Sequence, residues 1–146
     1  MNPIFISQIQ NAADLELLRG RKSFDYDYDD STMKLLKRNF KLEDSLYLLA
    51  KNGEEFVGFC SMDRGWWEEN HFFLREILVA GSYREAGIGT EFMKRCISHA
   101  KRKNASGILT ETAFDNRPMQ HLCAKFGFEK WENPEWKEGI TFKLVF

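Results

Sequence analysis

The residues best suited to chemistry lie in one segment, Tyr83-Arg84-Glu85-Ala86-Gly87-Ile88-Gly89-Thr90, between an apolar strand pattern and a long helical pattern. Two glycines one residue apart at a helix entrance allow close backbone approach, and the free amides of the first turn point outward along the helix dipole. This predicts an anion site, for which diphosphate is the natural ligand. The alternative is a tight turn that merely uses glycine. The Gly-Lys-Ser/Thr of nucleoside-triphosphate loops is absent, and Phe92 replaces the third glycine of the dinucleotide fingerprint.

The composition is that of an ordinary globular domain and excludes several functions. The 146 residues carry 21 basic and 22 acidic side chains, so a net charge of −1 argues against bulk nucleic-acid binding. The one tight basic cluster, Lys101-Arg102-Lys103, fits a helix C-terminus. We expect no membrane span and no signal peptide, because the chain lacks a long apolar run and the N-terminus lacks a basic region. The cysteines, Cys60, Cys96 and Cys123, are odd in number and widely spaced, which indicates the reducing cytoplasm and no metal site.

The elements that must position the glycine segment follow from hydrophobic periodicity, and we find one domain over residues 1–146. Strands are predicted at 4–9, 45–51, 55–63, 71–80, 107–114, 128–132 and 140–146. A short helix is capped by Asn11 and ends at Gly20, and a second is capped by Ser31 or Thr32. A long helix runs through 88–103, and a last one begins at Asn116 and ends at Gly127. Asn52-Gly53 predicts a two-residue hairpin turn.

The order βααβββαβαββ predicts a mixed sheet covered by helices, in the α/β or α+β class. The strand at 71–80, the long helix and the strand at 107–114 form a βαβ unit, so these two strands are expected to be parallel with a right-handed crossover.

Two signatures at the right separation resemble those of the GNAT family of N-acetyltransferases. The first is Arg84-x-x-Gly87-x-Gly89 after Ile77-Leu78-Val79. The second is Leu109-Thr110-Glu111-Thr112, followed by Asn116 and by the Lys125-Phe126-Gly127-Phe128 ending. The predicted element order matches the family over essentially the whole chain. The resemblance implies a mostly antiparallel sheet of about seven strands, with a central parallel pair that splays apart.

The resemblance also implies acetyl-CoA as co-substrate. Backbone amides from Arg84 to Thr90, a segment that includes Glu85, Ala86, Gly87, Ile88 and Gly89, would cradle its pyrophosphate. The strand edge near Leu78 and Val79 would pair with the pantetheine arm, and Asn116 would contact the arm or position the following helix. The acceptor amine would attack the thioester directly.

Direct attack needs a neutral amine, so a carboxylate must take a proton from the ammonium form. Glu111 is the first candidate, because it matches a glutamate of protein-amine branches of the family. It shares a strand face with Leu109 and Ala113, so its pKa is expected to rise. Glu76, on the preceding strand, is the second candidate. Each is alternatively a sheet carboxylate paired with an arginine or lysine.

Cys123 stands where many family members have a tyrosine that protonates the departing thiolate. It is either a substitute acid that faces the CoA sulfur or a small thiol that fills a helix face. His99 is expected on the solvent face of the long helix, and His121 lies on the helix that bears Cys123.

The segment between the first two helices usually helps to build the acceptor site in this family. Here it reads Asp25-Tyr26-Asp27-Tyr28-Asp29-Asp30, which suits a cation such as a polyamine, an aminoglycoside-like sugar, or a lysine or N-terminal amine. Alternatively it is a solvated loop whose last acids favour a helix N-terminus. Trp66-Trp67 forms either a second wall of this site or a dimer contact, which leaves monomer and homodimer open.

The sequence thus predicts an acetyl-CoA-dependent N-acetyltransferase with an amine acceptor that is expected to be cationic. Two rivals remain: a non-catalytic acyl-CoA-binding or regulatory domain of the same fold, and an interaction module unrelated to CoA.

Overall fold

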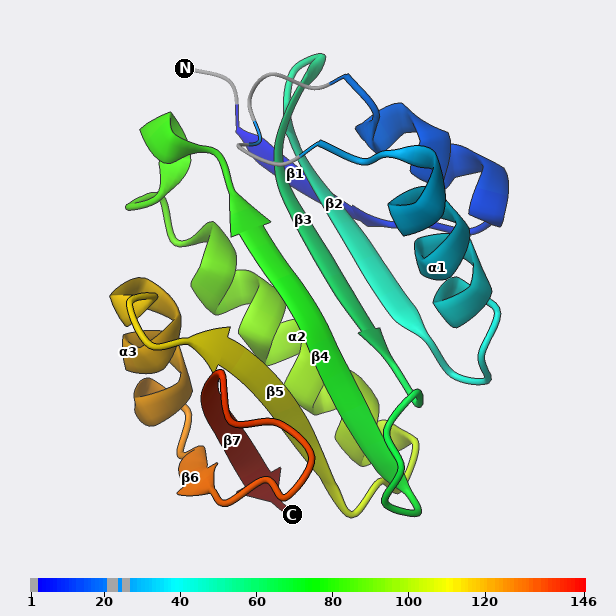
Figure 1. The fold of residues 1–146 in the computed structure, drawn as a ribbon. Helices are drawn as coiled ribbons and strands as arrows, with labels where there is room; N and C mark the ends of the chain where they lie inside the picture. The colour runs from blue at the N-terminus through cyan, green and yellow to red at the C-terminus, as the bar shows by residue number, and fades with distance from the viewer. Residues whose placement is uncertain (1–2, 21–23, 25–26) are drawn as a thin grey trace.

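The computed structural model describes residues 3–20, 24 and 27–146. Its strands form one seven-stranded sheet in the order β1-β2-β3-β4-β5-β7-β6. Only β4 and β5 are parallel, and every other pair of neighbours is antiparallel. The predicted mixed fold with one central parallel pair is confirmed (Figure 1). The strands are β1 (Ile4–Gln8), β2 (Leu46–Asn52), β3 (Glu55–Asp63), β4 (His71–Val79), β5 (Gly107–Ala113), β6 (Glu129–Trp131) and β7 (Gly139–Val145).

Helices cover both faces of this sheet. The two short 3-10 helices are η1 (Ala12–Leu18) and η2 (Gly81–Tyr83), and the α-helices are α1 (Asp30–Phe40), α2 (Ile88–Arg102) and α3 (Arg117–Lys125). On one face α2 and α3 bury an apolar core that includes Phe72, Phe92 and Cys123. On the other face η1 and α1 bury a second core around Tyr47 and Phe59 over β2 and β3.

The parallel pair separates halfway along its length. β4 and β5 are in register only from His71–Gly107 to Leu74–Thr110, after which β4 continues beside β3 and β5 continues beside β7. At the point of separation the Thr110 hydroxyl donates a hydrogen bond of 2.8 Å to the Leu74 carbonyl. That side-chain bond satisfies a buried carbonyl where the two backbones move apart. Beyond this point the two strands diverge, as Figure 1 shows, and we refer to the place of their separation as the opening of the sheet.

An extra residue in β4 sets which side chains face this opening. Met62 of β3 pairs with Leu74, and the adjacent Ser61 pairs with Glu76, so Arg75 is a bulge residue. The bulge interrupts the alternation of faces along the strand. Arg75 and Glu76 consequently both reach partners on the α1 side of the sheet, Asp63 and Tyr28 respectively.

Two expected turns and caps differ from the observed ones by one or two residues. The two-residue hairpin turn is Gly53-Glu54, because Gly53 adopts the positive φ (+62°) that the turn requires while Asn52 stays in β2 opposite Glu55. The α1 cap is Asp29, whose Oδ1 accepts a 2.8 Å hydrogen bond from the Thr32 amide. Neither expected cap, Ser31 or Thr32, is therefore used, since a carboxylate two or three residues earlier was available.

The expectation that His99 faces solvent is wrong. Its side chain is buried against the Phe72 ring, and its Nε2 lies 2.7 Å from the Asp44 carbonyl oxygen. Burial lowers the pKa of His99, which favours the neutral imidazole. The contact joins α2 to the α1–β2 connection, a pairing across 55 positions that no helical period reveals.

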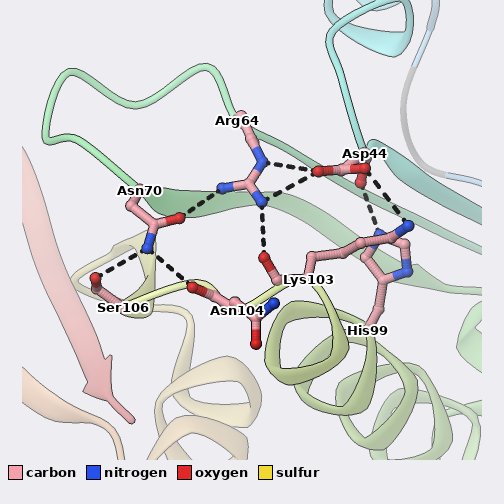
Figure 2. Close-up of polar contacts among 7 residues, drawn as sticks. All are labelled: Asp44, Arg64, Asn70, His99, Lys103, Asn104 and Ser106. Atoms are coloured by element: carbon pink, nitrogen blue, oxygen red, sulfur yellow. Dashed lines mark hydrogen bonds and ion pairs between the residues drawn. The ribbon is translucent and has the colours of Figure 1, made fainter.

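This contact belongs to a polar network at the end of the sheet away from the opening (Figure 2). Arg64 donates hydrogen bonds to Asp44 (3.1 Å), Asn70 (3.1 Å) and the Lys103 carbonyl (3.3 Å). Asn70 in turn donates to the Asn104 carbonyl at 2.9 Å. Among the described residues, the non-glycine positions with positive φ are Asp44, Asn70 and Asn104. The network therefore holds three strained turns together. Of the helices described, none is long and apolar enough to cross a membrane.

Candidate functional site

The glycine segment lies at the start of α2, where the sequence predicts a cradle of backbone amides. Gly87 precedes the helix with a φ of +83°, a left-handed conformation that suits glycine. The first helical hydrogen bond runs from the Glu91 amide to the Gly87 carbonyl at 3.0 Å. The amides of Ile88, Gly89 and Thr90 therefore precede it and lack intrahelical acceptors. They point along the helix axis, where the dipole favours an anion.

Open space lies in front of these amides. Residues 84–87 are exposed, and a Cβ built on Gly87 would meet no described atom within 4 Å. A Cβ on Gly89 would come no closer than 3.6 Å to Leu122 of α3 and 3.8 Å to Ile77 of β4. The backbone at Gly89 thus lies between a helix and a strand edge without filling the gap. The residues present fit a diphosphate group with an arm that extends toward the sheet.

The loop that leads to the cradle is tied to a distant hairpin, which sequence reasoning missed. The Tyr83 hydroxyl accepts a 2.7 Å hydrogen bond from the Asn52 side chain and donates one of 3.2 Å to Glu55. These contacts connect η2 to the turn between β2 and β3. The spacing of Tyr83 in the chain carries no signal of such a partner.

Two of the other predicted cofactor residues, Leu78 and Val79, lie on β4 beyond its separation from β5, and a third, Asn116, lies at the start of α3. Leu78 and Val79 are half-buried and pack toward the two opposite cores, so the backbone of β4 is left as an edge with no β5 partner at this level. Asn116 caps α3, and its Oδ1 accepts a 3.2 Å hydrogen bond from the Met119 amide. This contact assigns Asn116 a role in positioning α3.

Both candidate carboxylates lie on the α1 side of the sheet, just beyond the point where β4 and β5 separate. Glu76 is half-buried, and the Tyr28 hydroxyl donates a 3.0 Å hydrogen bond to its Oε2. Glu111 is also half-buried, and within the described residues it makes no hydrogen bond or ion pair. Burial raises the pKa of both carboxyls, and the positive charge of Arg75 opposes that rise in each case. A raised pKa suits a base that must hold a proton near neutral pH.

Arg75 is fixed by a buried carboxylate that the sequence did not single out. Asp63 is fully buried and accepts two hydrogen bonds from the Arg75 guanidinium, at 2.6 and 3.0 Å. It also accepts hydrogen bonds from the Tyr47 hydroxyl at 3.0 Å and the Gly65 amide at 2.8 Å. Asp63 neutralises Arg75, and among the described residues no arginine or lysine forms an ion pair with Glu76 or Glu111.

Cys123 is fully buried in the core between the sheet and its helices, even without a ligand. Burial raises the pKa of its thiol to about 12. Cys60 and Cys96 are also fully buried, with their sulfur atoms 3.5 Å apart. His121 is exposed on α3.

The acidic segment is used in part for the fold. Asp29 caps α1, and Asp30 pairs with Arg19 at 2.7 Å. Tyr28 is buried against Phe59, whereas Asp27 is exposed. The expected contributions of Asp25 and Tyr26 lie outside the described residues. Within the described part of the chain, no group of three or more His, Cys, Asp or Glu side chains gathers closely enough to hold a metal ion.

Comparison with known proteins agrees with this geometry. The family model described as "Acetyltransferase (GNAT) family" matches residues 13–128. Streptothricin acetyltransferase A of Bacillus subtilis is 28% identical over 103 residues, which are 70% of this chain and 56% of that protein. An uncharacterized N-acetyltransferase of Methanocaldococcus jannaschii is 28% identical over 67% of this chain and 43% of its own length. The chain thus spans about half the length of these curated relatives.

Solved structures show the same fold across the whole chain. The ribosomal-protein-S18-alanine N-acetyltransferase of Escherichia coli superimposes with a TM-score of 0.75 at 16% identity, covering 98% of this chain and 94% of that one. The protein YncA of Salmonella typhimurium, solved with acetyl-CoA, gives a TM-score of 0.72 at 14% identity, covering 99% and 94%.

Proposed function

The chain belongs to the GNAT family of acetyltransferases, and we propose that it transfers the acetyl group of acetyl-CoA to a primary amine by direct attack. The observation that carries this proposal is the presence, near the separation of β4 and β5, of the free first-turn amides of α2 and of Glu111, a carboxyl without an ion-pair partner among the described residues. The three widely spaced cysteines support a reducing compartment, and we place the enzyme in the cytoplasm.

In this proposal the first turn of α2 binds the pyrophosphate of acetyl-CoA through the amides of Ile88, Gly89 and Thr90. The edge of β4 near Leu78 and Val79 offers backbone groups to the amides of the pantetheine arm, because β5 has already diverged. The arm then takes the place of a missing strand in the opening. Acetyl-CoA supplies the acetyl group when it is bound, and a side chain of the protein accepts a proton from the ammonium form of the acceptor.

We assign the proton acceptor to Glu111. An ammonium that enters beside this half-buried carboxylate loses one proton to it, and the amine nitrogen then bonds to the thioester carbonyl carbon. The carbon–sulfur bond breaks and the CoA thiolate leaves. The second ammonium proton, which is still on the nitrogen after the attack, passes through water to that thiolate. Glu76 is the less favoured base, because the Tyr28 hydroxyl already occupies one of its oxygens.

No side chain on α3 is proposed as the acid. A thiol with a pKa of about 12 is a much weaker acid than the departing CoA thiol, whose pKa lies near the ordinary value of about 8.5. Cys123 is therefore assigned to packing, and the thiolate takes its proton from water.

The test is CoA release from acetyl-CoA with a panel of primary amines, followed for the wild type, Glu111→Gln and Glu76→Gln. We expect Glu111→Gln to lower kcat by roughly 10²–10⁴ and to leave acetyl-CoA binding near normal. Glu76→Gln serves as the matched control on the neighbouring strand and should lose less. If Glu76→Gln loses more activity than Glu111→Gln, the base is Glu76.

The absence of a tyrosine at position 123 favours one rival, an acyl-CoA-binding domain without turnover. That rival predicts tight acetyl-CoA binding by the wild type and no CoA release with any amine. Turnover with a single amine would exclude it.

A further inference from the structure

All four tryptophans of this chain gather on the sheet face that carries Glu111. Trp66 and Trp67 lie between β3 and β4, Trp131 lies in β6, and Trp136 lies between β6 and β7. They come from segments up to 70 positions apart in the sequence.

Three of the indoles contact each other directly. The Trp66 and Trp67 rings stack with centroids 5.2 Å apart and an interplanar angle of 26°. Both rings also contact Trp131, at 6.2 and 5.7 Å. Trp66 rests on Phe73 of β4 at 5.1 Å, whereas Trp67 is 56% exposed. The Trp66 indole N–H is buried and has no acceptor among the described residues, so this ring is held by its faces alone.

Strand register places Glu111 beside these rings. Glu111 is opposite Thr141, and Thr141 is opposite Trp131, so the three side chains share one face across β5, β7 and β6. Two strand spacings separate the Glu111 and Trp131 backbones by about 10 Å. Trp136 covers the same face two residues along β7, because a Cβ on Gly139 would collide with its ring. Trp131 therefore lies across the strands from Glu111, and Trp136 lies further along the strand direction on the same face.

Two basic side chains on this face, Lys143 and Arg75, are already paired with carboxylates. Lys143 lies 3.0 Å from Glu68 and 5.3 Å from the Trp131 ring centroid, and Arg75 is held by Asp63. Glu111 is left as the carboxyl without a described partner at the aromatic surface. Glu76, the other carboxyl on this side of the sheet, already accepts the hydrogen bond of the Tyr28 hydroxyl, so Glu111 is the better match for an ammonium. Additional positive charges on a ligand would meet Lys143 and Arg75.

We propose that the acceptor is a primary monoamine with a planar, apolar body, and not a polyamine or an aminoglycoside-like sugar. The ammonium lies against Glu111, and the planar body stacks on the indole surface that ends at Trp67. This inference rests on the proposed function, since it names the substrate of the same site.

Binding tests it without turnover, because the four indoles are an intrinsic fluorescent reporter of this face. We would titrate the protein, with free CoA present, with four probes: phenethylamine, cyclohexylethylamine, phenethyl alcohol and spermidine. Phenethylamine should change the indole emission and bind about two- to tenfold tighter than cyclohexylethylamine, which has the same ammonium on a non-planar ring. Phenethyl alcohol lacks the charge and spermidine lacks the ring, so both should bind more weakly still. Equal or tighter binding of spermidine would overturn the proposal.

Trp67→Leu removes the exposed indole with little effect on folding, and Phe5→Leu is the matched control, since Phe5 is 72% exposed on the distant edge strand β1. We expect Trp67→Leu to raise the phenethylamine Kd about two- to tenfold and Phe5→Leu to leave it unchanged. An unchanged Kd in Trp67→Leu, or a loss of dimer in that variant with no effect on binding, would show that the surface serves a second copy of the chain instead.

Measurements of turnover distinguish the proposed acetyl transfer from the proposed class of acceptor. CoA release with spermidine and not with phenethylamine would leave the proposed function intact and refute the acceptor class. Phenethylamine binding that depends on Trp67, with no CoA release from any amine, would refute the proposed function and support the aromatic site.

Discussion

The half-buried carboxyl of Glu76 makes the stability of the folded protein depend on pH. Glu76 has a pKa above its ordinary value of 4.5, and burial is the main cause. The folded protein therefore binds this proton more tightly than the unfolded chain does. The resulting stabilisation is fully present below a pH of about 4.5 and is lost as the pH rises through the folded pKa.

Glu76→Gln should remove this pH dependence, because glutamine stays neutral and still accepts the hydrogen bond from Tyr28. We expect the variant to gain stability relative to the wild type as the pH rises from acidic to neutral. Urea unfolding over a pH series measures the effect. Glu129→Gln, at an exposed position of β6, is the control and should not change the pH slope. Parallel curves for Glu76→Gln and the wild type would contradict the account.

Experiments on Cys123 can distinguish a role in packing from a role as a catalytic acid. Because its side chain is fully buried, iodoacetamide should react slowly with and without CoA, as at Cys60 and Cys96. Cys123→Ala should cost less than roughly tenfold in kcat, below the usual contribution of a general acid. Labelling followed by mass spectrometry checks the first expectation. Rapid labelling of the native protein, or a loss of a hundredfold with cofactor affinity intact, would restore an acid role.

At the scale of elements, the Arg64 network joins the end of β3 to the C-terminal end of α2 and to the turn before β5. The guanidinium also lies 4.3 Å from the Phe72 ring centroid, so it contributes packing as well as hydrogen bonds. Its partners include two of the three strained turns, at Asp44 and Asn70 (Figure 2).

We expect Arg64→Lys to lower the free energy of unfolding by about 1–3 kcal/mol, because lysine cannot reach several acceptors with one planar group. Arg95→Lys is the matched control, since Arg95 makes an exposed pair with Glu91 on α2 and should change stability by less than about 0.5 kcal/mol. Equilibrium urea unfolding measures both. Equal changes in the free energy of unfolding for Arg64→Lys and Arg95→Lys would show that the Arg64 network does not stabilise the fold.

At the scale of the whole molecule, ligand binding and folding are linked by mass action. A ligand at 100 times its Kd adds about 2.7 kcal/mol to the stability of the folded state. For a domain of this size, acetyl-CoA should therefore raise the Tm by about 5–10 °C.

Gly89→Glu should abolish this shift by placing a negative charge where the diphosphate binds. Gly89→Gln adds nearly the same bulk without the charge, so it separates electrostatic from steric loss. The geometry at Gly89 accepts a Cβ at ordinary contact distances, which favours folding of both variants. Thermal melts with and without acetyl-CoA are the measurement. If acetyl-CoA raises the Tm of Gly89→Glu as much as that of the wild type, the diphosphate does not bind at the start of α2.

The sequence by itself determined what depends on neighbours along the chain. The cradle at Gly87–Gly89, the Asn116 cap and the helix stop at Gly127 each follow from local backbone chemistry. The order of elements along the chain follows from periodicity, and the parallel pair follows from the βαβ unit, whereas the place of β7 between β5 and β6 was not predicted. The sequence also predicted that Glu111 and Leu109 share one face of the strand, because side chains alternate along a strand.

Only the tertiary structure decided what depends on residues far apart in the chain. The bulge at Arg75 sets which face receives Glu76, and no local signal marks it. The pairing of Arg75 with Asp63, the burial of His99 against Asp44 and the assembly of four tryptophans around Glu111 all join separate elements. Local propensity fixes the geometry of one segment, whereas the partner of a buried polar or aromatic side chain is fixed by the packing of several segments at once.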